Sequence, residues 1–542
     1  MLSYRKLAMR VLGRPLHTEG IDSPRPASQR AAAFILTAAM LTTLAAPAFA
    51  DIWHIENGDI TISAGESGNN VTQNNNTTYG DTNTIITNQN KDTASSHTVT
   101  IEAKDKDDKV EVTLKDVNID TSSRNKAAVS VTGEGDTNIK LDGDNALKSD
   151  IYRSGIYGSG SGSLTISGGE NDSLTAQGGS GANGISSSGS LTISGGTVTA
   201  NGDDGGRGIS SSGSVTISGG STVTANGGSG TISGGDGIWS GGGVTISGGS
   251  TVTANGGNGG SLVGGDGIRS GGGLTVSDGT VTAKGGNGDS KDGYGGDGIR
   301  SGGVVTISGN TVNAAGGYGG KVGGYGICSF DRVAISGGTV EAAGGNGSTG
   351  GGSGIYSSVI DLSGSLELTA KAGSPTGKAL LQNGRELDLD TIKDKLGPGA
   401  KVTATDANGD SKQVSIPRPV EPEEPVIPEE SSSSSDGGSA TPSAPVSPLP
   451  GLTVTDKDGQ RISYTSTQSG NTLTVCVGRF TASFRISLAA LRQLRAEGIE
   501  TITFQTILCS TTLSVDELLA MGGEDAEAVL THRFTDSSLT VG

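Results

Sequence analysis

The chain is poor in the residues that most catalytic and metal sites use. Only 4 of its 542 residues are histidine, and His54, His97 and His532 stand too far apart to form a pair with the spacing of zinc ligands. Aromatic residues make up only 3% of the chain. The sequence shows neither a histidine pair nor two close carboxylates placed for glycoside hydrolysis, and it therefore predicts a protein that is not an enzyme.

Cysteine is scarce as well, with 3 residues in the whole chain. In an oxidising exterior Cys476 and Cys509 could form a disulfide bond with each other, which would leave Cys328 alone. Three unpaired thiols in a protein from a reducing environment are the alternative. An odd number of cysteines leaves both interpretations open.

Long apolar runs are also scarce. The apolar run near the N-terminus belongs to a predicted signal peptide at residues 1–50. Basic residues come first, the apolar run from Ala31 to Leu44 follows, and Ala48-Phe49-Ala50 supplies the small residues that precede a signal-peptidase cut. The run is short for a membrane anchor, so we expect no membrane insertion. We expect a secreted chain that begins at Asp51 and is released or held non-covalently at the cell surface.

Positive charge is in short supply. The chain has 38 Lys and Arg residues against 56 Asp and Glu residues, which gives a net charge of −18. Removal of residues 1–50, which hold six basic and two acidic residues, changes the net charge to −22. So acidic a chain repels the phosphate backbone, which excludes nucleic acid as a partner.

Glycine, by contrast, is abundant, with 94 residues, and it belongs to a repeat. A Gly-Ile step recurs through the middle of the chain, and its isoleucines are separated by 24 to 31 residues, which is the length of one solenoid coil. These isoleucines are Ile185, Ile209, Ile238, Ile268, Ile299, Ile327 and Ile355. Apolar residues that keep their phase over so many units indicate a folded repeat rather than disorder.

Each repeat unit contains short strands. Val215 and Ile217 alternate with Thr216 and Ser218 in the period of two that is typical of half-buried strands. Three such strands per unit are joined by glycine-rich corners, because glycine accepts the positive φ of sharp turns. The sequence therefore predicts an all-β solenoid, a right-handed parallel β-helix, in which inward Ile, Val and Ala side chains form a continuous core.

Changes in composition divide the chain into six predicted segments. They are a signal peptide at 1–50, irregular N-terminal coils and cap at 51–155, glycine-rich β-helix repeats at 156–372, a C-terminal solenoid cap at 373–416, a Pro/Glu/Ser linker at 417–450 and a small α+β domain at 451–542. In the last segment we expect one helix after the N-cap residue Ser487 and another at the capping box of Ser514 and Glu517.

An aspartate precedes the Gly-Ile step in three successive units, at Asp236, Asp266 and Asp297. Stacked coils would bring these side chains into one column. Three interpretations are open: each aspartate caps its own corner through backbone N–H groups, the column binds calcium weakly through carboxylate oxygens, or the acids take part in catalysis. At another corner we expect an amide ladder of Asn201, Asn226 and Asn255.

The residue after each marker isoleucine is expected to face solvent, because side chains alternate along a strand. This outward column comprises Ser210, Trp239, Arg269, Arg300, Cys328 and Tyr356. We predict that Trp239, Arg269, Arg300 and Tyr356 bind carbohydrate, because aromatic rings suit the apolar faces of sugars and guanidinium groups suit uronate carboxylates. Scattered surface residues without a role are the alternative.

Two segments of the chain carry a resemblance to a known family. Residues 110–120 and 127–147, followed by coils with the sequence Leu-Thr-Ile-Ser-Gly-Gly, are similar to the bacterial secreted β-helix proteins called carbohydrate-binding domain-containing proteins. The resemblance covers roughly residues 55–380. It implies a right-handed β-helix related to polysaccharide lyases that binds plant or acidic polysaccharides, with calcium in some members.

These features predict a secreted, noncatalytic protein that binds an acidic polysaccharide, with calcium as the one cofactor to test. A surface adhesin that binds host protein and a divergent polysaccharide lyase are the alternatives. Unsaturated products or new reducing ends from pectin would identify the lyase, and a glycan array would separate the two kinds of binder.

Overall fold

The computed structural model describes residues 51–417 and most of residues 451–541. The gaps in the second range are 457–459, 463, 470, 478–480, 507–509, 522–525 and 533–536. The predicted signal peptide, and all of the predicted linker except residue 417, lie outside the described residues. The chain divides into two compact units, Met1–Pro422 and Glu423–Gly542.

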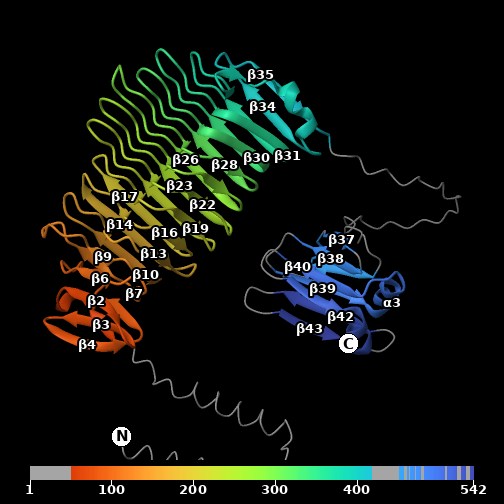
Figure 1. Ribbon diagram of the computed structural model, residues 1–542, viewed down its shortest axis with the longest axis horizontal. Helices are drawn as coiled ribbons and strands as arrows, with labels where there is room; N and C mark the ends of the chain where they lie inside the picture. The colour runs from red at the N-terminus through yellow and green to blue at the C-terminus, as the bar shows by residue number, and fades with distance from the viewer. Residues whose placement is uncertain are drawn as a thin grey trace, which may run out of the picture. The chain divides into compact units, whose positions relative to one another are not determined.

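The first unit is a parallel β-solenoid of about 14 turns (Figure 1), as the glycine repeat predicts. In the repeat region each strand pairs in parallel with the strand three places along the chain, so every coil gives one strand to each of three ladders. The first ladder contains β12 (Ile156–Gly158), β15 (Ile185–Ser187), β18 (Ile209–Ser211), β21 (Ile238–Ser240), β24 (Ile268–Ser270) and β27 (Ile299–Ser301). The second contains β13 (Leu164–Ser167), β16 (Leu191–Ser194), β19 (Val215–Ser218), β22 (Val244–Ile246), β25 (Leu274–Val276) and β28 (Val305–Ile307). The third contains β14 (Ser173–Ser180), β17 (Thr197–Asp203), β20 (Thr222–Asn226), β23 (Ser250–Asn255), β26 (Gly279–Lys284) and β29 (Thr311–Ala315).

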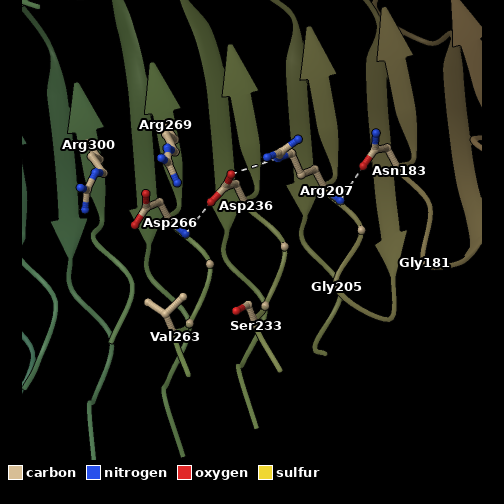
Figure 2. A pocket seen from close by; sticks show the side chains of 15 residues that line it. Gly181, Asn183, Gly205, Arg207, Ser233, Asp236, Val263, Asp266, Arg269 and Arg300 are labelled. Carbon is tan, nitrogen blue, oxygen red and sulfur yellow. Dashed lines mark hydrogen bonds and ion pairs between the residues drawn. The ribbon is translucent and has the colours of Figure 1, made fainter. Parts of the chain in front are cut away.

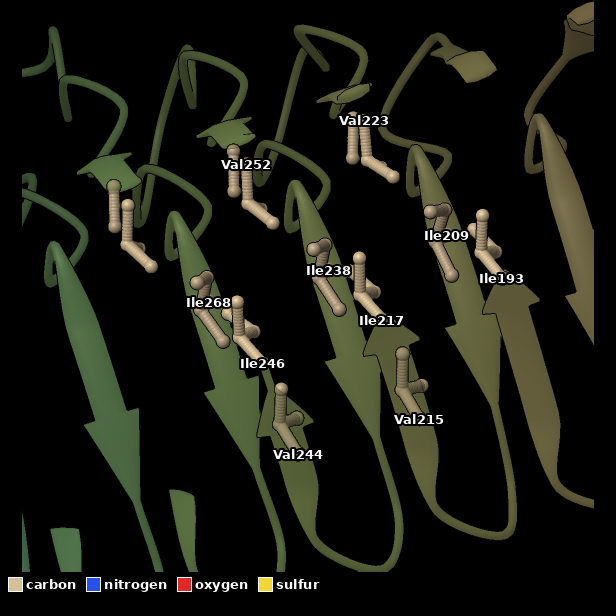
Figure 3. Packing of buried hydrophobic residues seen from close by; sticks show 14 of the residues in the cluster. Ile193, Ile209, Val215, Ile217, Val223, Ile238, Val244, Ile246, Val252 and Ile268 are labelled. Carbon is tan, nitrogen blue, oxygen red and sulfur yellow. The ribbon is translucent and has the colours of Figure 1, made fainter. Parts of the chain in front are cut away.

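Hydrophobic side chains from the three ladders fill the interior of the solenoid (Figure 3). Ile209, Ile238 and Ile268 are direct partners in successive coils, and none of them has exposed surface. Ile246 in β22 is equally buried, whereas its neighbour Thr245 is exposed. Because each coil stacks like residues on like residues, aliphatic side chains alone form a continuous core.

The expected amide ladder is present at one corner of the coils. Asn226 Nδ2 donates to Asn201 Oδ1, and Asn255 Nδ2 donates to Asn226 Oδ1, each at 2.8 Å. The three residues are register partners in β17, β20 and β23. The half-buried side-chain amides therefore find their hydrogen-bond partners in the equivalent asparagines of the neighbouring coils.

The N-terminal end of the solenoid begins with an antiparallel meander. Its strands are β2 (Ile60–Gly65), β3 (Gly68–Gln73) and β4 (Asn76–Asp81). The other N-terminal strands are β1 (Ile52–His54), β5 (Thr84–Thr87), β6 (Val99–Ala103), β7 (Lys109–Lys115), β8 (Asn118–Asp120), β9 (Val129–Gly133), β10 (Asp136–Asp142) and β11 (Asp144–Lys148), with the 3-10 helix η1 (Ile55–Asn57) after β1. Parallel pairing of each strand with the third strand along the chain is established from β6 onward.

The repeat ends in longer strands and a short helix. The last elements are β30 (Ile327–Ala343), β31 (Ile355–Lys371), β32 (Leu380–Gln382), β33 (Arg385–Glu386), the 3-10 helix η2 (Leu389–Lys395), β34 (Lys401–Thr405) and β35 (Ser411–Ser415). β34 pairs in parallel with β31 and antiparallel with β35. The antiparallel strand β35 therefore continues the sheet beyond the last parallel pair.

The second unit contains two four-stranded sheets and two helices in its described residues. One sheet has the order β36 (Leu452–Thr455), β39 (Ala482–Ser487), β42 (Glu527–His532) and β43 (Ser537–Val541). The other has the order β37 (Thr465–Ser469), β38 (Thr472–Cys476), β40 (Thr501–Gln505) and β41 (Ser510–Ser514). The helices are α3 (Leu488–Ala496) and α4 (Val515–Met521).

Both helix starts are where the sequence predicts them. Ser487 Oγ accepts a hydrogen bond from the Ala490 N–H at 3.2 Å before α3. Ser514 Oγ accepts one from the Glu517 N–H at 3.4 Å before α4. No helix in the described parts of the chain has the length and apolar composition needed to cross a membrane.

The structure does not decide between a Cys476–Cys509 disulfide bond and unpaired thiols, because Cys509 lies outside the described residues. Cys476 Sγ lies 3.4 Å from Gln505 Oε1. Cys328 is 1% exposed in the solenoid, where burial raises the pKa of its thiol to about 12. A neutral, buried thiol is unreactive.

Candidate binding groove

The residues that precede the Gly-Ile steps form a column along the solenoid, because the steps themselves are in register. Asp236 Oδ1 accepts a hydrogen bond from the Asp266 N–H at 2.9 Å, and Asp266 Oδ1 accepts one from the Asp297 N–H at 2.7 Å. Asp297 Oδ1 accepts in turn from the Tyr325 N–H at 2.7 Å. Each aspartate therefore caps the next coil rather than its own corner, because its register partner offers the nearer N–H.

Glycine forms the backbone around this column. A Cβ atom added to Gly265 would lie 1.9 Å from the carbonyl oxygen of Gly235 in the preceding coil. No side chain fits so close a backbone approach. The glycine-rich sequence thus brings the coils close enough for a side chain in one coil to bond the amide of the next.

The carboxylates of the column are almost completely buried, with exposures of 6% for Asp236 and Asp266 and 4% for Asp297. Burial raises the pKa of Asp266, and the charges of Asp297 and Asp236 raise it further. Burial also raises the pKa of Asp297, although the Tyr325 N–H and Arg300 act in the opposite direction. At neutral pH the column therefore carries less negative charge than three aspartates suggest.

Three arginines lie beside the column, and two of them have partners within it. Arg207 Nε lies 3.1 Å from Asp236 Oδ2, and Arg300 Nη1 lies 3.3 Å from Asp297 Oδ2. Within the described residues Arg269 makes no hydrogen bond, ion pair or ring contact. Its exposed guanidinium group is therefore available to an anion from solution.

A groove of about 540 Å³ lies over the column. Its charged lining residues are Arg207, Asp236, Asp266, Arg269 and Arg300. Figure 2 shows Arg269 and Arg300 on one side of the aspartates, and Ser233 and Val263 on the other. The groove thus has a guanidinium wall, a buried carboxylate floor and a second wall without charge.

The predicted outward column is in register, but it is not exposed throughout. Trp239, Arg269, Arg300, Cys328 and Tyr356 pair in that order along the first ladder. Arg269 is exposed, whereas Cys328 is buried. The expectation of a solvent-facing position is wrong for Cys328, because its thiol is short and its register neighbours, Arg300 and Tyr356, have long side chains. Ser210, another small side chain at the start of the column, is buried too.

The two predicted aromatic residues make contacts with other residues of the solenoid. The guanidinium carbon of Arg207 lies 4.5 Å from the ring centroid of Trp239, and the ring of Tyr356 stacks on that of Tyr325 at 5.1 Å between centroids. Neither ring is among the residues that line the groove. The structure thus brings Arg269 and Arg300 together in one groove and leaves Trp239 and Tyr356 outside its lining.

Sequence reasoning missed Arg207 and the second wall. Arg207 stands directly before Gly208 and Ile209, in the position that Asp236 has in the next unit. Comparison of this position in all units, not only in those with aspartate, would have found it. Val263 gives a weaker signal, because the residue type at this position changes from unit to unit, from Ser233 to Val263 to Tyr294.

The predicted calcium site requires carboxylate oxygens that already have partners. One oxygen of each aspartate accepts a backbone N–H, and the other oxygen of Asp236 and Asp297 faces an arginine. In the described parts of the chain no three His, Cys, Asp or Glu side chains are placed to hold a metal ion together. Calcium stays a prediction.

Calorimetric titration with calcium tests the predicted calcium site in the aspartate column. We expect any uptake to be weak, because the ion has to displace Arg207 and Arg300 from their carboxylates. A triple variant, Asp236→Asn, Asp266→Asn and Asp297→Asn, removes the charge and keeps an acceptor oxygen at each position. Uptake that is equal in the parent and in this variant, or absent from both, would contradict a calcium site in the column.

Comparison of the chain with protein-family models, with curated proteins and with solved structures found no match. The resemblance to carbohydrate-binding β-helix proteins is therefore confirmed only for the solenoid fold.

Proposed function

We propose that this protein is a secreted, noncatalytic binding protein for an acidic polysaccharide, which lies in the groove over the aspartate column. The observation that carries the proposal is the exposed guanidinium group of Arg269, which makes no hydrogen bond or ion pair with the described residues and acts on Asp297 only through its charge. Guanidinium groups bind carboxylates through two parallel hydrogen bonds. A uronate of the polymer is the partner we assign to it.

The charge of the whole chain makes this groove distinctive. The net charge is −18, so most of the surface repels an anionic polymer. Arg207, Arg269 and Arg300 line one groove, and the neighbouring carboxylates are buried and hydrogen-bonded. The groove is therefore a local exception where an acidic polymer can bind.

The same contacts favour binding over catalysis. A general acid or base needs a carboxylate that can reach the substrate. Asp236, Asp266 and Asp297 are more than nine-tenths buried and bond the backbone of the next coil. In this proposal Asp236 and Asp297 hold Arg207 and Arg300 in place through ion pairs. We therefore expect neither unsaturated products nor new reducing ends from polygalacturonate.

Replacement of Arg269 by alanine is expected to weaken binding of polygalacturonate by about ten- to a hundredfold, because a charge-assisted hydrogen bond contributes about 1.5 to 3 kcal/mol. Arg332→Ala is the matched control, because Arg332 is exposed and lies outside the groove lining. Calorimetry on both variants and the parent measures the change.

The neutral methyl ester of the same polymer is expected to bind poorly to all three proteins. Undiminished binding by the Arg269→Ala variant would contradict the proposal. If the parent binds no acidic glycan on an array but binds host protein, the adhesin alternative would be supported instead.

A further inference from the structure

One reactive dipeptide, Asn-Gly, recurs along the solenoid. An asparagine before a glycine converts to aspartate and isoaspartate without an enzyme, because glycine has no side chain to keep its own amide nitrogen away from the asparagine side chain. The chain contains 10 such steps, all within residues that the structure describes. Their asparagines are Asn57, Asn183, Asn201, Asn226, Asn255, Asn258, Asn287, Asn346, Asn383 and Asn408. The fold decides which of these steps can react.

Most of the steps are protected by hydrogen bonds of the glycine. Its nitrogen has to attack the carbonyl carbon of the asparagine side chain, so a hydrogen bond donated by its N–H slows the reaction. The Gly227 N–H donates to Asn255 O at 2.8 Å, and the Gly259 N–H donates to Asn287 O at 2.7 Å. The N–H groups of Gly58, Gly184, Gly256, Gly288, Gly347 and Gly409 also donate to backbone carbonyl oxygens, and Gly202 lies inside strand β17. The amide ladder fixes three of the asparagine side chains in addition.

Asn383 lacks this protection. It stands at the tip of the hairpin of β32 and β33, where Gln382 and Arg385 are partners and Asn383 and Gly384 form the turn. Both turn residues have positive φ, 45° and 75°, which is typical of a type I′ turn. Both are exposed. Neither the Asn383 side chain nor the Gly384 N–H makes a hydrogen bond with the described residues.

We propose that Asn383 is a site of spontaneous modification in this protein. The Gly384 nitrogen gives its proton to solvent hydroxide and forms a bond to Cγ of Asn383, and the side-chain nitrogen leaves as ammonia. Water then opens the resulting cyclic imide at either of its carbonyl carbons. One opening gives aspartate, and the other gives isoaspartate, in which the main chain runs through the side-chain carbon.

The modification acts at the C-terminal end of the first ladder. β32 is the last parallel strand of that ladder, because Leu380 pairs with Ile355 and the following strand, β33, is antiparallel. Leu380 is 1% exposed, so it belongs to the core. Isoaspartate adds a backbone atom to the turn, and Gln382 and Arg385 then lose their register. Terminal caps protect the core of a solenoid, so the C-terminal cap loosens.

Asn408 gives the matched comparison for the reaction. It is also exposed, between β34 and β35, but the N–H of the following Gly409 donates to Asp406 O at 3.1 Å. The full chain is incubated at pH 8 and digested with trypsin, which releases residues 379–385 and 402–412. Mass spectrometry then measures the fraction of each peptide that has exchanged its amide for a carboxyl group.

We expect Asn383 to convert about three- to tenfold faster than Asn408 in the folded protein, because one hydrogen bond protects Gly409. In urea the two rates are expected to be similar, since both asparagines precede glycine. Equal rates in the folded protein, or faster conversion of Asn408, would overturn the proposed site.

Asn383→Gly tests the effect on the cap. Glycine keeps the turn, because it accepts positive φ, and it has no side-chain amide. After the same incubation we expect a fraction of the parent to melt at a lower temperature, in proportion to the isoaspartate at position 383, whereas the variant melts as before. A parent that melts unchanged after Asn383 has converted would overturn the loosening of the cap.

Discussion

Replacement of Ile246 by aspartate is expected to unfold the coils around β22 and to lower the free energy of unfolding by about 4 kcal/mol or more. Ile246 has no exposed surface and stacks between Ile217 and Val276, its partners in the neighbouring coils. A carboxylate at this position has no polar partner. Because a coil is stabilised mainly by its two neighbours, the damage spreads to them.

Thermal denaturation followed by circular dichroism measures this effect, as a lower melting temperature and a weaker β-sheet signal. Thr245→Asp is the matched control, because Thr245 is the exposed neighbour of Ile246 in the same strand. The control is expected to change stability by about 0.5 kcal/mol or less. An Ile246→Asp variant that melts like the parent would contradict the inward position.

The fold could be predicted because the same pattern of glycine and alternating apolar residues recurs in every unit of the repeat. A single run such as 215–218 fits several structures, but the return of the Gly-Ile step every coil fixes which residues stack. Ile209, Ile238 and Ile268 are partners in the structure for that reason. The sequence could not show how long side chains lean across the coils, so the burial of Cys328 was not foreseen.

The site could be predicted only in part, for a related reason. Register follows from the repeat, and it places Asp236, Asp266 and Asp297 in one column. Which atom each carboxylate bonds depends on how closely the loops of neighbouring coils approach, and glycines such as Gly265, which leave no room for a Cβ atom, allow that approach. The contact of Arg207 with Trp239 likewise joins two coils and has no signature in either unit alone.

The stability of the solenoid is expected to fall as the pH rises from about 4 to about 8. Burial raises the pKa of Asp266 to about 8 and that of Asp297 to about 6, from 3.8. In this window the native state keeps protons that the unfolded chain has released, so a rise in pH favours unfolding, and the loss is complete above the folded pKa.

Asp59 has the opposite effect on the pH dependence of stability, and it limits the stability of the solenoid at acid pH. Burial raises the pKa of Asp59. Its hydrogen bonds with Lys126, Arg124, Thr98 and His97 outweigh this effect and hold the pKa well below its usual range. A lowered pKa gives stability above the unfolded value, and this stability is lost as the pH falls below about 4. We therefore expect a stability maximum on the acid side of neutrality, measured by urea denaturation at a series of pH values.

Asp266→Asn is expected to make the solenoid more stable than the parent at pH 8 and to remove most of the fall between pH 5 and pH 8. Asparagine keeps an oxygen for the Asp297 N–H, and the chain already uses this solution, because Asn183 Oδ1 accepts the Arg207 N–H at 2.8 Å in an earlier coil. Asp289→Asn, at an exposed aspartate, is expected to leave the pH profile unchanged. A profile that stays as steep in the Asp266→Asn variant would assign the titration to another group. A flattened profile would show that Asp266, under the guanidinium wall, lowers the stability of the solenoid above pH 5. An acid that is kept at a cost in stability is typical of a binding site.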